Sequence, residues 1–483
     1  MLKHKIIMLF LGALLLVESV FMFVAVAIST IYSEIDFQFL LISAIITFLV
    51  GLLLVIPNFK IDKKVDKRES YLIVSLAWIV LSLFGSLPFF ISGYIPNFTD
   101  AFFETMSGFT TTGASILDNI ESLPHGLLFW RSLTQWIGGM GIIVLSIATI
   151  PIVKSGGMQL FVAEVPGIST DKLHPRIKGT AKKLWLVYIS LTFILSVLLF
   201  FSGMDWFDAI NHAFTTMATG GYSTKQASIA YWSAPSIHYI ILVFMILSGI
   251  NYSVLYFGLT GKIKKLIKNT EVKFYLFLII SLSSILALGL WFYMDLPIEK
   301  SIRDSFFQVA SVMTTTGFST NDYTQWHPNG LWLIILVVML IGGSSGSTSG
   351  GIKVVRIHVL LRNSILEFKR LLFPNAVLPV RYNKLVLSEK TVNSVLAFVI
   401  LYAVLIVLGT IVLSFTDLDF TSSLGAVVAS ISNVGPALGS FGPSASFSEI
   451  SIFGKWLLSF MMLVGRLELF TVMILFTKTF WRK

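Results

Sequence analysis

Three short tracts of threonine and glycine follow an aspartate at a constant distance, and a fourth, looser tract follows a serine. The aspartate or serine precedes the glycine of its tract by thirteen residues in every copy. The four pairs are Asp100 and Gly113, Asp208 and Gly221, Asp304 and Gly317, and Ser422 and Gly435. A fixed spacing in several copies indicates a repeated structural unit.

The residues of these tracts have the chemistry of an oxygen-lined cation site. Glycine lets the backbone turn its carbonyl groups towards one axis, and threonine adds hydroxyl oxygens. Four such tracts around one axis would replace the hydration shell of a dehydrated monovalent cation, as potassium-channel filters do. The candidate filter residues are Thr110, Thr111, Thr112, Gly113, Ala218, Thr219, Gly220, Gly221, Thr314, Thr315, Thr316, Gly317, Ser432, Asn433, Val434 and Gly435.

A short helix is predicted between each aspartate or serine and its tract. Asp and Ser are good N-cap residues, and about eleven helical residues would span about 16 Å, half of a bilayer core. Such a half-helix would enter the membrane, stop at mid-depth and return as extended backbone, which must be buried in protein or line a cavity. The alternative is that the tracts are re-entrant packing elements without a role in ion binding.

The composition places the whole chain in a membrane. Its 483 residues are 55% hydrophobic and only 12% charged, with a mean hydropathy of +0.84, whereas an ordinary soluble domain has about 25% charged residues. Cysteine is absent, which excludes disulfides and Cys-ligated zinc. Ten segments are apolar enough to cross a bilayer, and we expect the first to remain uncleaved. The predicted spans are 6–30, 38–57, 71–93, 125–150, 183–203, 237–260, 272–294, 331–361, 391–415 and 452–478.

Basic residues gather in alternate loops, those after the second, fourth, sixth and eighth predicted spans, whereas acids prevail in most of the others. By the positive-inside rule, both termini are then cytoplasmic. The net charge of +10 is therefore a topology signal, and nucleic acid is not an expected partner. The basic residues of these loops are Lys60, Lys63, Lys64, Lys67 and Arg68; Lys172, Arg176, Lys178, Lys182 and Lys183; Lys262, Lys264, Lys265 and Lys268; and Arg362, Lys369, Arg370, Arg381 and Lys384.

The eighth predicted span is interrupted by ten consecutive small residues, which form helices poorly. They are Gly342, Gly343, Ser344, Ser345, Gly346, Ser347, Thr348, Ser349, Gly350 and Gly351. A phosphate-binding loop is excluded because Lys353 is followed by Val354, so the Gly-Lys-Ser/Thr sequence is missing. Unwound polar backbone at membrane depth should line a cavity, although a flexible packing kink is the alternative.

Two arginines lie in or near predicted spans. Arg466 is inside the last span, where an arginine is costly and by default suggests a function. Its alternative role is a structural salt bridge, but the nearby Glu468 is two residues away and points to another face of a helix. Arg131 lies beside Gln135, and we expect it to be a structural anchor, although the sequence does not decide its role.

The repeated unit of span, half-helix and span resembles the Trk/Ktr/HKT superfamily of potassium transporters. Two additional N-terminal spans and the final segments 465–470 and 476–482 are similar to its TrkH branch in particular. The resemblance covers essentially the whole chain. It implies that one glycine in each tract marks a K⁺ filter, that segment 342–351 is a gate below the filter, and that Arg466 lies just under the filter and opposes cations or holds the gate closed. The fourth tract departs most from the threonine-rich pattern.

The resemblance implies an all-α polytopic membrane protein, with four repeated helix–pore half-helix–helix units around a central pore and two additional N-terminal transmembrane helices. The expected divisions are residues 1–68 for these two helices, 69–160 and 161–268 for repeats 1 and 2, 269–370 for repeat 3 with its broken second helix, and 371–483 for repeat 4. A homodimer is implied as well, together with a TrkA-like cytoplasmic ring that binds NAD or ATP/ADP.

The sequence therefore predicts a K⁺ uptake protein of the bacterial cytoplasmic membrane, with K⁺ as the transported ion and no organic cofactor bound by this chain. No catalytic constellation is apparent, because the seven histidines are scattered. One alternative is a secondary transporter that couples K⁺ to H⁺ or Na⁺, and such proteins also use broken helices and repeats. The other is a membrane enzyme or scaffold without ion flux.

Overall fold

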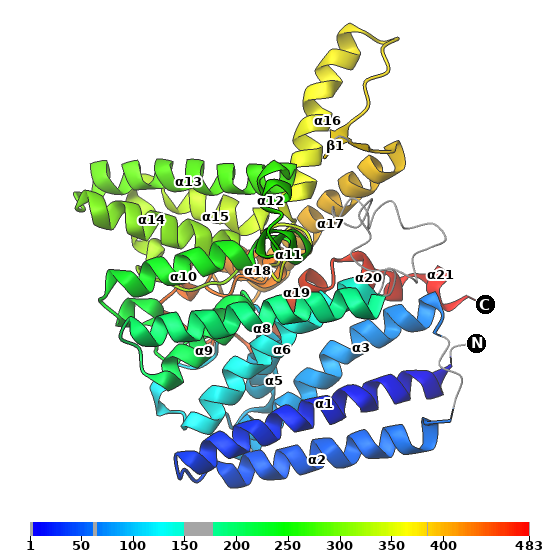
Figure 1. Ribbon diagram of the computed structural model, residues 1–483, viewed down its shortest axis with the longest axis vertical. Helices are drawn as coiled ribbons and strands as arrows, with labels where there is room; N and C mark the ends of the chain where they lie inside the picture. Colours follow the sequence, from blue (N-terminus) through cyan, green and yellow to red (C-terminus); the bar gives the residue numbers. More distant parts are fainter. Residues whose placement is uncertain (1–2, 61–64, 149–176, 384, 483) are drawn as a thin grey trace.

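The computed structural model describes residues 3–60, 65–148, 177–383 and 385–482, and the fold is helical with one small hairpin (Figure 1). The predicted basic residues Lys63, Lys64, Lys172, Arg176 and Lys384 lie outside the described residues. The long helices are α1 (His4–Ile31), α2 (Phe37–Val55), α3 (Lys67–Gly85), α6 (His125–Ala148), α8 (Ile177–Phe201), α13 (Thr270–Met294) and α17 (Glu389–Ser414).

The shorter elements connect, extend or break these helices. They are α4 (Leu87–Ile91), α10 (Pro235–Ser248), α11 (Tyr252–Leu259), α12 (Ile263–Lys268), α15 (Trp332–Ile341), α16 (Val354–Leu372), α19 (Ile452–Arg466), α20 (Phe470–Met473) and α21 (Lys478–Trp481), with 3₁₀ turns at η1 (Ile56–Asn58), η2 (Ile120–Ser122), η3 (Ser228–Tyr231), η4 (Tyr323–Asn329), η5 (Gly439–Phe441) and η6 (Ile474–Phe476).

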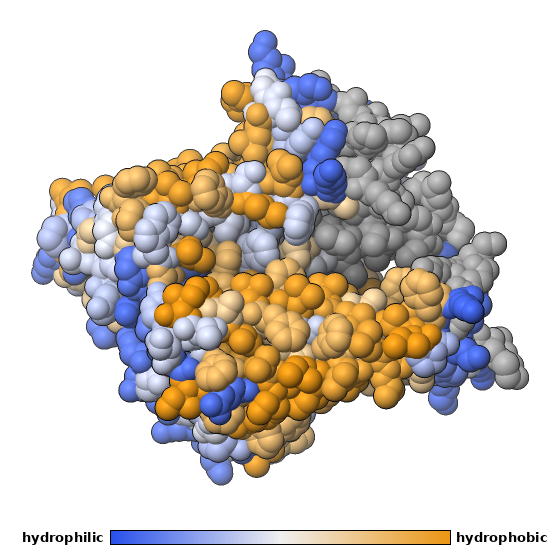
Figure 2. Space-filling model, turned by 60° about the horizontal axis from the view of Figure 1, so that its bottom comes forward, coloured by the Kyte–Doolittle hydropathy of each residue, from blue (hydrophilic) through white to orange (hydrophobic). Residues whose placement is uncertain are grey.

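Six helices of the described chain are long and apolar enough to cross a membrane, or eight if each of two bent pairs is one span. The space-filling view shows a broad apolar face bordered by hydrophilic residues (Figure 2). Exposed side chains such as Leu53, Phe201 and Ile400 contribute to the apolar surface. An exposed apolar surface of this extent suits lipid rather than water. Both termini lie at the same edge of the molecule (Figure 1).

Helices α1 and α2 pack closely because each contributes a small residue to their contact. A Cβ atom on Gly12 would lie 2.7 Å from the Cβ of Leu54, and one on Gly51 would lie 3.1 Å from the backbone oxygen of Gly12. Such close approach through small residues is typical of membrane helices, where apolar burial alone gives no driving force.

The predicted spans 237–260 and 452–478 are not straight helices. Helix α10 meets α11 at 112°, and α19 meets the segment Phe470–Phe476 at 111°. The predicted span 331–361 is broken as expected, since α15 ends at Ile341 and α16 begins at Val354. Helix α16 then projects from the body, and the hairpin of β1 (Arg381–Tyr382) and β2 (Leu385–Val386) lies near its base (Figure 1).

Four short helices precede the four predicted tracts, as expected. They are α5 (Phe98–Phe109), α9 (Trp206–Met217), α14 (Ile298–Met313) and α18 (Phe420–Ser432), of 12, 12, 16 and 13 residues. At 1.5 Å per residue the shortest are about 18 Å long, roughly half of a bilayer.

The predicted N-caps of these half-helices are wrong. Asp100, Asp208, Asp304 and Ser422 all lie inside the helices. The caps are earlier residues, because Asn97, Asp205 and Asp419 accept hydrogen bonds from backbone amides of the first turn, and α14 begins after Pro297. Hydrogen bonds from Ser422 hold the pKa of Asp419 below its usual value, as expected for a carboxylate that caps a helix.

Candidate ion-conducting site

The four candidate filter tracts share one backbone conformation. The residue two positions before each glycine is left-handed, with φ between 51° and 57° at Thr111, Thr219, Thr315 and Asn433. The glycines Gly113, Gly221, Gly317 and Gly435 also have positive φ, between 76° and 95°. Asparagine tolerates the left-handed region well, so the fourth tract adopts the same turn despite its different sequence.

One backbone hydrogen bond recurs in each turn. The amide of the residue before the glycine donates to the carbonyl five residues earlier, at 2.8 or 2.9 Å in all four tracts. The pairs are Thr112 and Ser107, Gly220 and Thr215, Thr316 and Ser311, and Val434 and Ala429. We call residues 110–113, 218–221, 314–317 and 432–435 filter loops 1 to 4.

The filter loops meet one another in a closed ring. A Cβ atom built on the glycine of each loop would collide with the backbone oxygen of the residue before the glycine in the next loop. The contacts run from Gly113 to Gly220, from Gly221 to Thr316, from Gly317 to Val434, and from Gly435 back to Thr112, the last at 2.6 Å. Only glycine fits these four places, and the cyclic order brings backbone oxygens of all four loops together.

Three of the four residues predicted as caps, Asp208, Asp304 and Ser422, brace the chain that returns from their filter loop, whereas Asp100 pairs with Lys455 of α19 at 2.6 Å. Asp208 Oδ1 accepts a hydrogen bond from Thr224 Oγ1 at 2.6 Å. Asp304 Oδ1 accepts the equivalent bond from Thr320 Oγ1 at 3.2 Å, again sixteen residues later. The constant spacing of Asp208 and Asp304 therefore reflects contacts to the returning strand.

Three further residues behind the filter loops were not predicted. Glu104, His212 and Gln308 each lie nine residues before a filter glycine and bind the returning segment of their own repeat. Glu104 accepts bonds from Ser115 Oγ at 3.0 Å and from the amide of Ile116 at 2.9 Å. The equal spacing was a usable signal, but three different residue types conceal it.

Arg131 is an anchor in this supporting layer, in agreement with the expectation. Its Nε donates to Glu104 Oε1 at 2.7 Å and its Nη1 donates to the carbonyl of Ser223 at 3.0 Å. The guanidinium carbon lies 3.5 Å from the ring centre of Tyr222. Both charged side chains are buried, so Arg131 ties the half-helix before filter loop 1 to the segment after filter loop 2.

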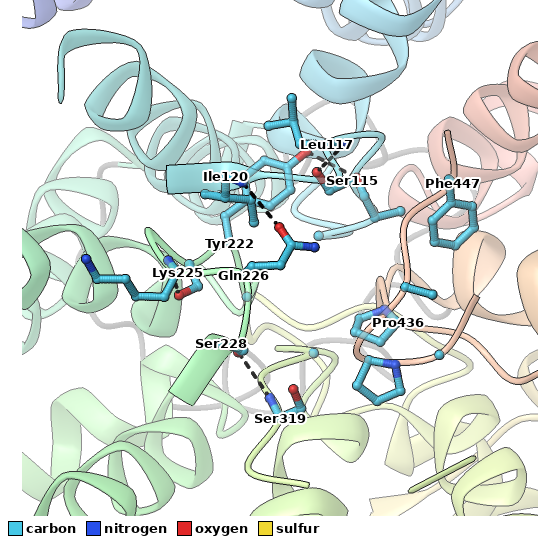
Figure 3. Close-up of a pocket in the computed structure, with 18 of the residues that line it drawn as sticks. Ser115, Leu117, Ile120, Tyr222, Lys225, Gln226, Ser228, Ser319, Pro436 and Phe447 are labelled. Atoms are coloured by element: carbon cyan, nitrogen blue, oxygen red, sulfur yellow. Dashed lines mark hydrogen bonds between the residues drawn. The ribbon is translucent and has the colours of Figure 1, made fainter. Parts of the chain in front are cut away.

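A pocket of about 60 Å³ lies on the side to which the chain returns from the filter loops (Figure 3). Residues of all four repeats line it, including the filter glycines Gly113, Gly221 and Gly317. Side chains such as Ser115, Gln226, Ser319 and Pro436 surround the opening (Figure 3). The pocket therefore leads to the ring of filter glycines.

The segment 342–351, which we call the Gly/Ser loop, lies against the opposite side of the filter loops. The amide of Gly350 donates to Thr315 Oγ1 at 2.7 Å, and Thr348 Oγ1 donates to the carbonyl of Met217 at 3.1 Å. A Cβ atom on Gly350 would collide with the backbone oxygen of Ser432. The loop thus contacts the inner ends of repeats 2, 3 and 4.

Arg466 holds the Gly/Ser loop from the remaining side. Its Nη1 donates to the carbonyl of Thr348 at 2.6 Å, and its Nη2 donates to the carbonyl of Gly138 in α6 at 3.2 Å. Arg466 is buried. The alternative of a salt bridge to Glu468 does not hold, because Glu468 pairs with Arg356 at 2.7 Å.

Two side chains hold the first half of the Gly/Ser loop, residues 342–346. Asn251, in the bend between α10 and α11, donates from Nδ2 to the carbonyl of Ser345 at 2.6 Å. Glu271, in the first turn of α13, accepts a bond from the amide of Ser345 at 2.7 Å. The bend in the sixth predicted span therefore helps to hold the Gly/Ser loop, because it places Asn251 against the loop.

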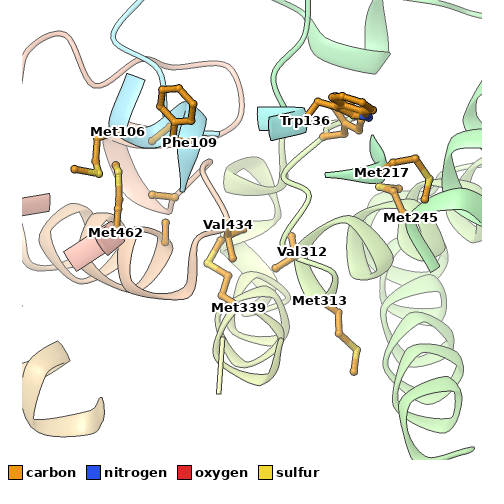
Figure 4. Close-up of a cluster of buried hydrophobic side chains, with 14 of the residues drawn as sticks. Met106, Phe109, Trp136, Met217, Met245, Val312, Met313, Met339, Val434 and Met462 are labelled. Carbon is orange, nitrogen blue, oxygen red and sulfur yellow. The ribbon is translucent and has the colours of Figure 1, made fainter. Parts of the chain in front are cut away.

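Apolar side chains surround the filter loops and fix their depth in the fold (Figure 4). Met106, Phe109, Met217, Val312 and Met462 belong to one buried cluster that joins the four repeats. Among the described residues, no group of three or more His, Cys, Asp or Glu residues could hold a metal ion. The filter loops themselves present backbone oxygens and hydroxyl groups.

Apolar crossing helices, four half-helices and a buried ring of loops define a polytopic α-helical membrane transport protein. A family model described as TrkH, cation transport protein, matches residues 37–483, so the chain belongs to the TrkH family. The Trk system potassium uptake protein TrkH of Escherichia coli K12 is 43% identical over 439 residues, which cover 90% of each chain. The TrkH protein of Halomonas elongata is 37% identical, with 99% of each chain covered.

The fold agrees with a solved relative over its full length. The crystal structure of the potassium transporter TrkH from Vibrio parahaemolyticus superposes with a TM-score of 0.91 at 35% identity, with 100% of both chains covered. The predicted resemblance and the all-α polytopic membrane fold are confirmed. The chain is a transport protein and not an enzyme.

Proposed function

We propose that this protein takes up K⁺ across the bacterial cytoplasmic membrane through the ring of filter loops. The observation that carries the proposal is the closed ring in which each filter glycine lies against a backbone oxygen of the next loop. The relatives named above are potassium uptake proteins or a potassium transporter, which supports K⁺ as the ion. The backbone oxygens and threonine hydroxyls of the filter loops would replace the hydration shell of K⁺.

The Gly/Ser loop and Arg466 are the proposed gate. The loop lies directly beneath the filter loops, and the positive charge of Arg466 lies next to it. In this position the loop obstructs the path of the ion, and the buried guanidinium opposes a cation in it. Opening would require two hydrogen bonds to break, the one between Gly350 and Thr315 and the one between Thr348 and Arg466.

The proposal includes cytoplasmic termini, as the positive-inside rule predicts from the basic loops, so ions would enter from the side of the pocket. An inside-negative potential contributes about 2.3 kcal/mol per 100 mV for each monovalent cation that enters. This driving force supports accumulation without a chemical reaction. We propose the repeat boundaries given above and, following the family, a homodimer with a TrkA-like nucleotide-binding ring on the basic loops.

The proposal is tested with purified protein in liposomes, by measuring uptake of radioactive rubidium with K⁺ or Na⁺ as competitor. We expect K⁺ to compete far better than Na⁺. Gly113→Ser should weaken this preference, because serine would collide with the carbonyl of Gly220. Gly93→Ser is the matched control, since Gly93 also has positive φ but has open space around it.

Equal competition by Na⁺ and K⁺ in the wild type would refute K⁺ selectivity. Single-channel currents would support a gated pore. A saturable flux with a fixed ratio of K⁺ to H⁺ or Na⁺ would instead favour the coupled transporter.

A further inference from the structure

Filter loops 1 and 3 are braced by their own side chains. In each, the threonines one and three positions before the glycine share a hydrogen bond between hydroxyl groups at 2.8 Å. The pairs are Thr110 with Thr112 and Thr314 with Thr316. These bonds connect the end of the half-helix with the residue whose backbone oxygen lies in the ring.

Filter loop 2 lacks both of these hydroxyl groups, because Ala218 and Gly220 occupy the two positions. A side chain from another repeat is found there instead. Gln135 of α6 donates from Nε2 to the carbonyl of Gly220 at 2.7 Å and accepts at Oε1 from the amide of Tyr222 at 3.0 Å. The two bonds hold the backbone on both sides of the filter glycine Gly221.

The fit between Gln135 and Gly220 explains why glycine stands at this position. The φ angle of Gly220 is not positive, so the backbone turn does not require glycine. A Cβ atom on Gly220 would instead collide with the carboxamide of Gln135, with its Nε2 only 2.8 Å away. The carboxamide therefore occupies the space that the threonine side chain fills in loops 1 and 3.

We propose that Gln135 is a positioning residue that sets the geometry of filter loop 2 and thereby contributes to the choice between K⁺ and Na⁺. It acts through the carbonyl of Gly220, the oxygen that lies against Gly113 in the ring. Its carboxamide is buried and both polar atoms are bonded to the loop. A shift of this carbonyl would alter the size of the ring and the electrostatic field of its carbonyl dipoles. Selectivity among cations depends on these two properties. The inference rests on the proposed function.

The test measures the ratio of K⁺ to Na⁺ concentrations that half-inhibit rubidium uptake in liposomes. This ratio does not depend on the amount of active protein, so a loss of folded protein alone leaves it unchanged. Gln135→Ala removes two hydrogen bonds, and we expect the preference for K⁺ to fall about tenfold. Gln135→Glu keeps the size and the acceptor for Tyr222, but its ionised form sets a carboxylate oxygen against the carbonyl of Gly220, so its preference should also fall.

A second substitution separates positioning from simple packing. Gly220→Thr alone should also reduce the preference, because its side chain collides with Gln135. Gln135→Ala combined with Gly220→Thr removes this collision, so the double variant should have a clearly higher preference for K⁺ than Gly220→Thr alone. Ser132→Ala is the matched control, since Ser132 is buried on the same helix and bonds only to the carbonyl of Leu128 among the contacts of the described chain.

A wild-type ratio in both Gln135 variants would overturn the inference, as would a double variant no better than the worse single one. These results differ from those expected if the proposed function itself is wrong. If it is wrong, the wild type and the Ser132→Ala control would already fail to prefer K⁺.

Discussion

The filter loops and the Gly/Ser loop are both non-helical backbone buried at membrane depth, yet they are held in different ways. Each filter loop repeats the same turn, the same amide bond and the same contact of glycine with the next loop. The Gly/Ser loop is fixed by single hydrogen bonds to distant parts of the chain. They come from side chains such as Thr315, Asn251, Glu271 and Arg466 and from the backbone of Gly249 and Tyr252.

This difference separates a part that must keep its shape from a part that can move. Backbone conformation and ring closure fix the filter loops, so one loop cannot shift without its neighbour. The Gly/Ser loop can leave its position when these few hydrogen bonds break, each with a net value of about 1 kcal/mol, or somewhat more for a charged partner. The comparison predicts that substitutions in the first region abolish selective transport, whereas those around the second change the opening.

The largest effect is expected for Gly317→Ala. The added Cβ atom would collide with the backbone oxygen of Val434 and would also be strained at a φ of 82°. We expect K⁺-selective uptake to be lost, as measured by rubidium uptake in liposomes. Gly203→Ala is the control, because φ is positive there as well but no atom lies within 4 Å. Equal activity of the two variants would contradict the closed ring.

The second effect concerns the layer that supports the filter loops. Arg131→Ala would leave the buried carboxylate of Glu104 without its charged partner, which typically costs about 3–5 kcal/mol. We expect a much lower thermal stability of the purified protein in detergent. Arg131→Ala with Glu104→Gln should recover part of this loss, because the unpaired charge is removed. If the double variant is as unstable as the single one, the ion pair does not explain the anchoring.

The third effect is a gain of flux. Arg466→Ala removes the bonds to Thr348 and Gly138 and the positive charge beside the ion path. We expect basal K⁺ flux without any partner protein to rise about tenfold. Arg370→Ala is the control, because Arg370 is partly exposed and pairs with Glu367 within the last turns of the projecting helix α16. Unchanged or lower flux at normal expression would exclude a closing role for Arg466.

Much of the fold was predictable because it depends on patterns that a single sequence displays. Hydropathy located the spans, and the constant spacing of aspartate and glycine located the four half-helices and their loops. The Gly/Ser tract identified the break between α15 and α16. In each case the signal lies within one segment, since apolar length, glycine content and spacing do not require knowledge of a distant contact.

The remainder depends on contacts between segments that are far apart in the sequence. The bend at residues 249–251 has no proline and places Asn251 against a loop almost a hundred residues away. Gln135 looked like a polar neighbour of Arg131, and its role appears only beside Gly220, 85 residues later. The helix caps were misplaced because aspartates with constant spacing resemble caps, although Asp208 and Asp304 bind the returning strand and Asp100 binds Lys455.

The smallest effect tests whether the Gly/Ser loop is held by individual bonds. Glu271 accepts one hydrogen bond from the amide of Ser345, so Glu271→Ala should raise basal flux only about fivefold, the equivalent of roughly 1 kcal/mol. Glu271→Gln keeps an acceptor at the same place and should retain nearly wild-type flux in the same rubidium assay. If both variants raise the flux equally, the charge of Glu271 rather than its bond restrains the loop. If neither variant raises the flux, the first half of the loop does not move on opening, and the movable part is confined to residues near Thr348 and Gly350.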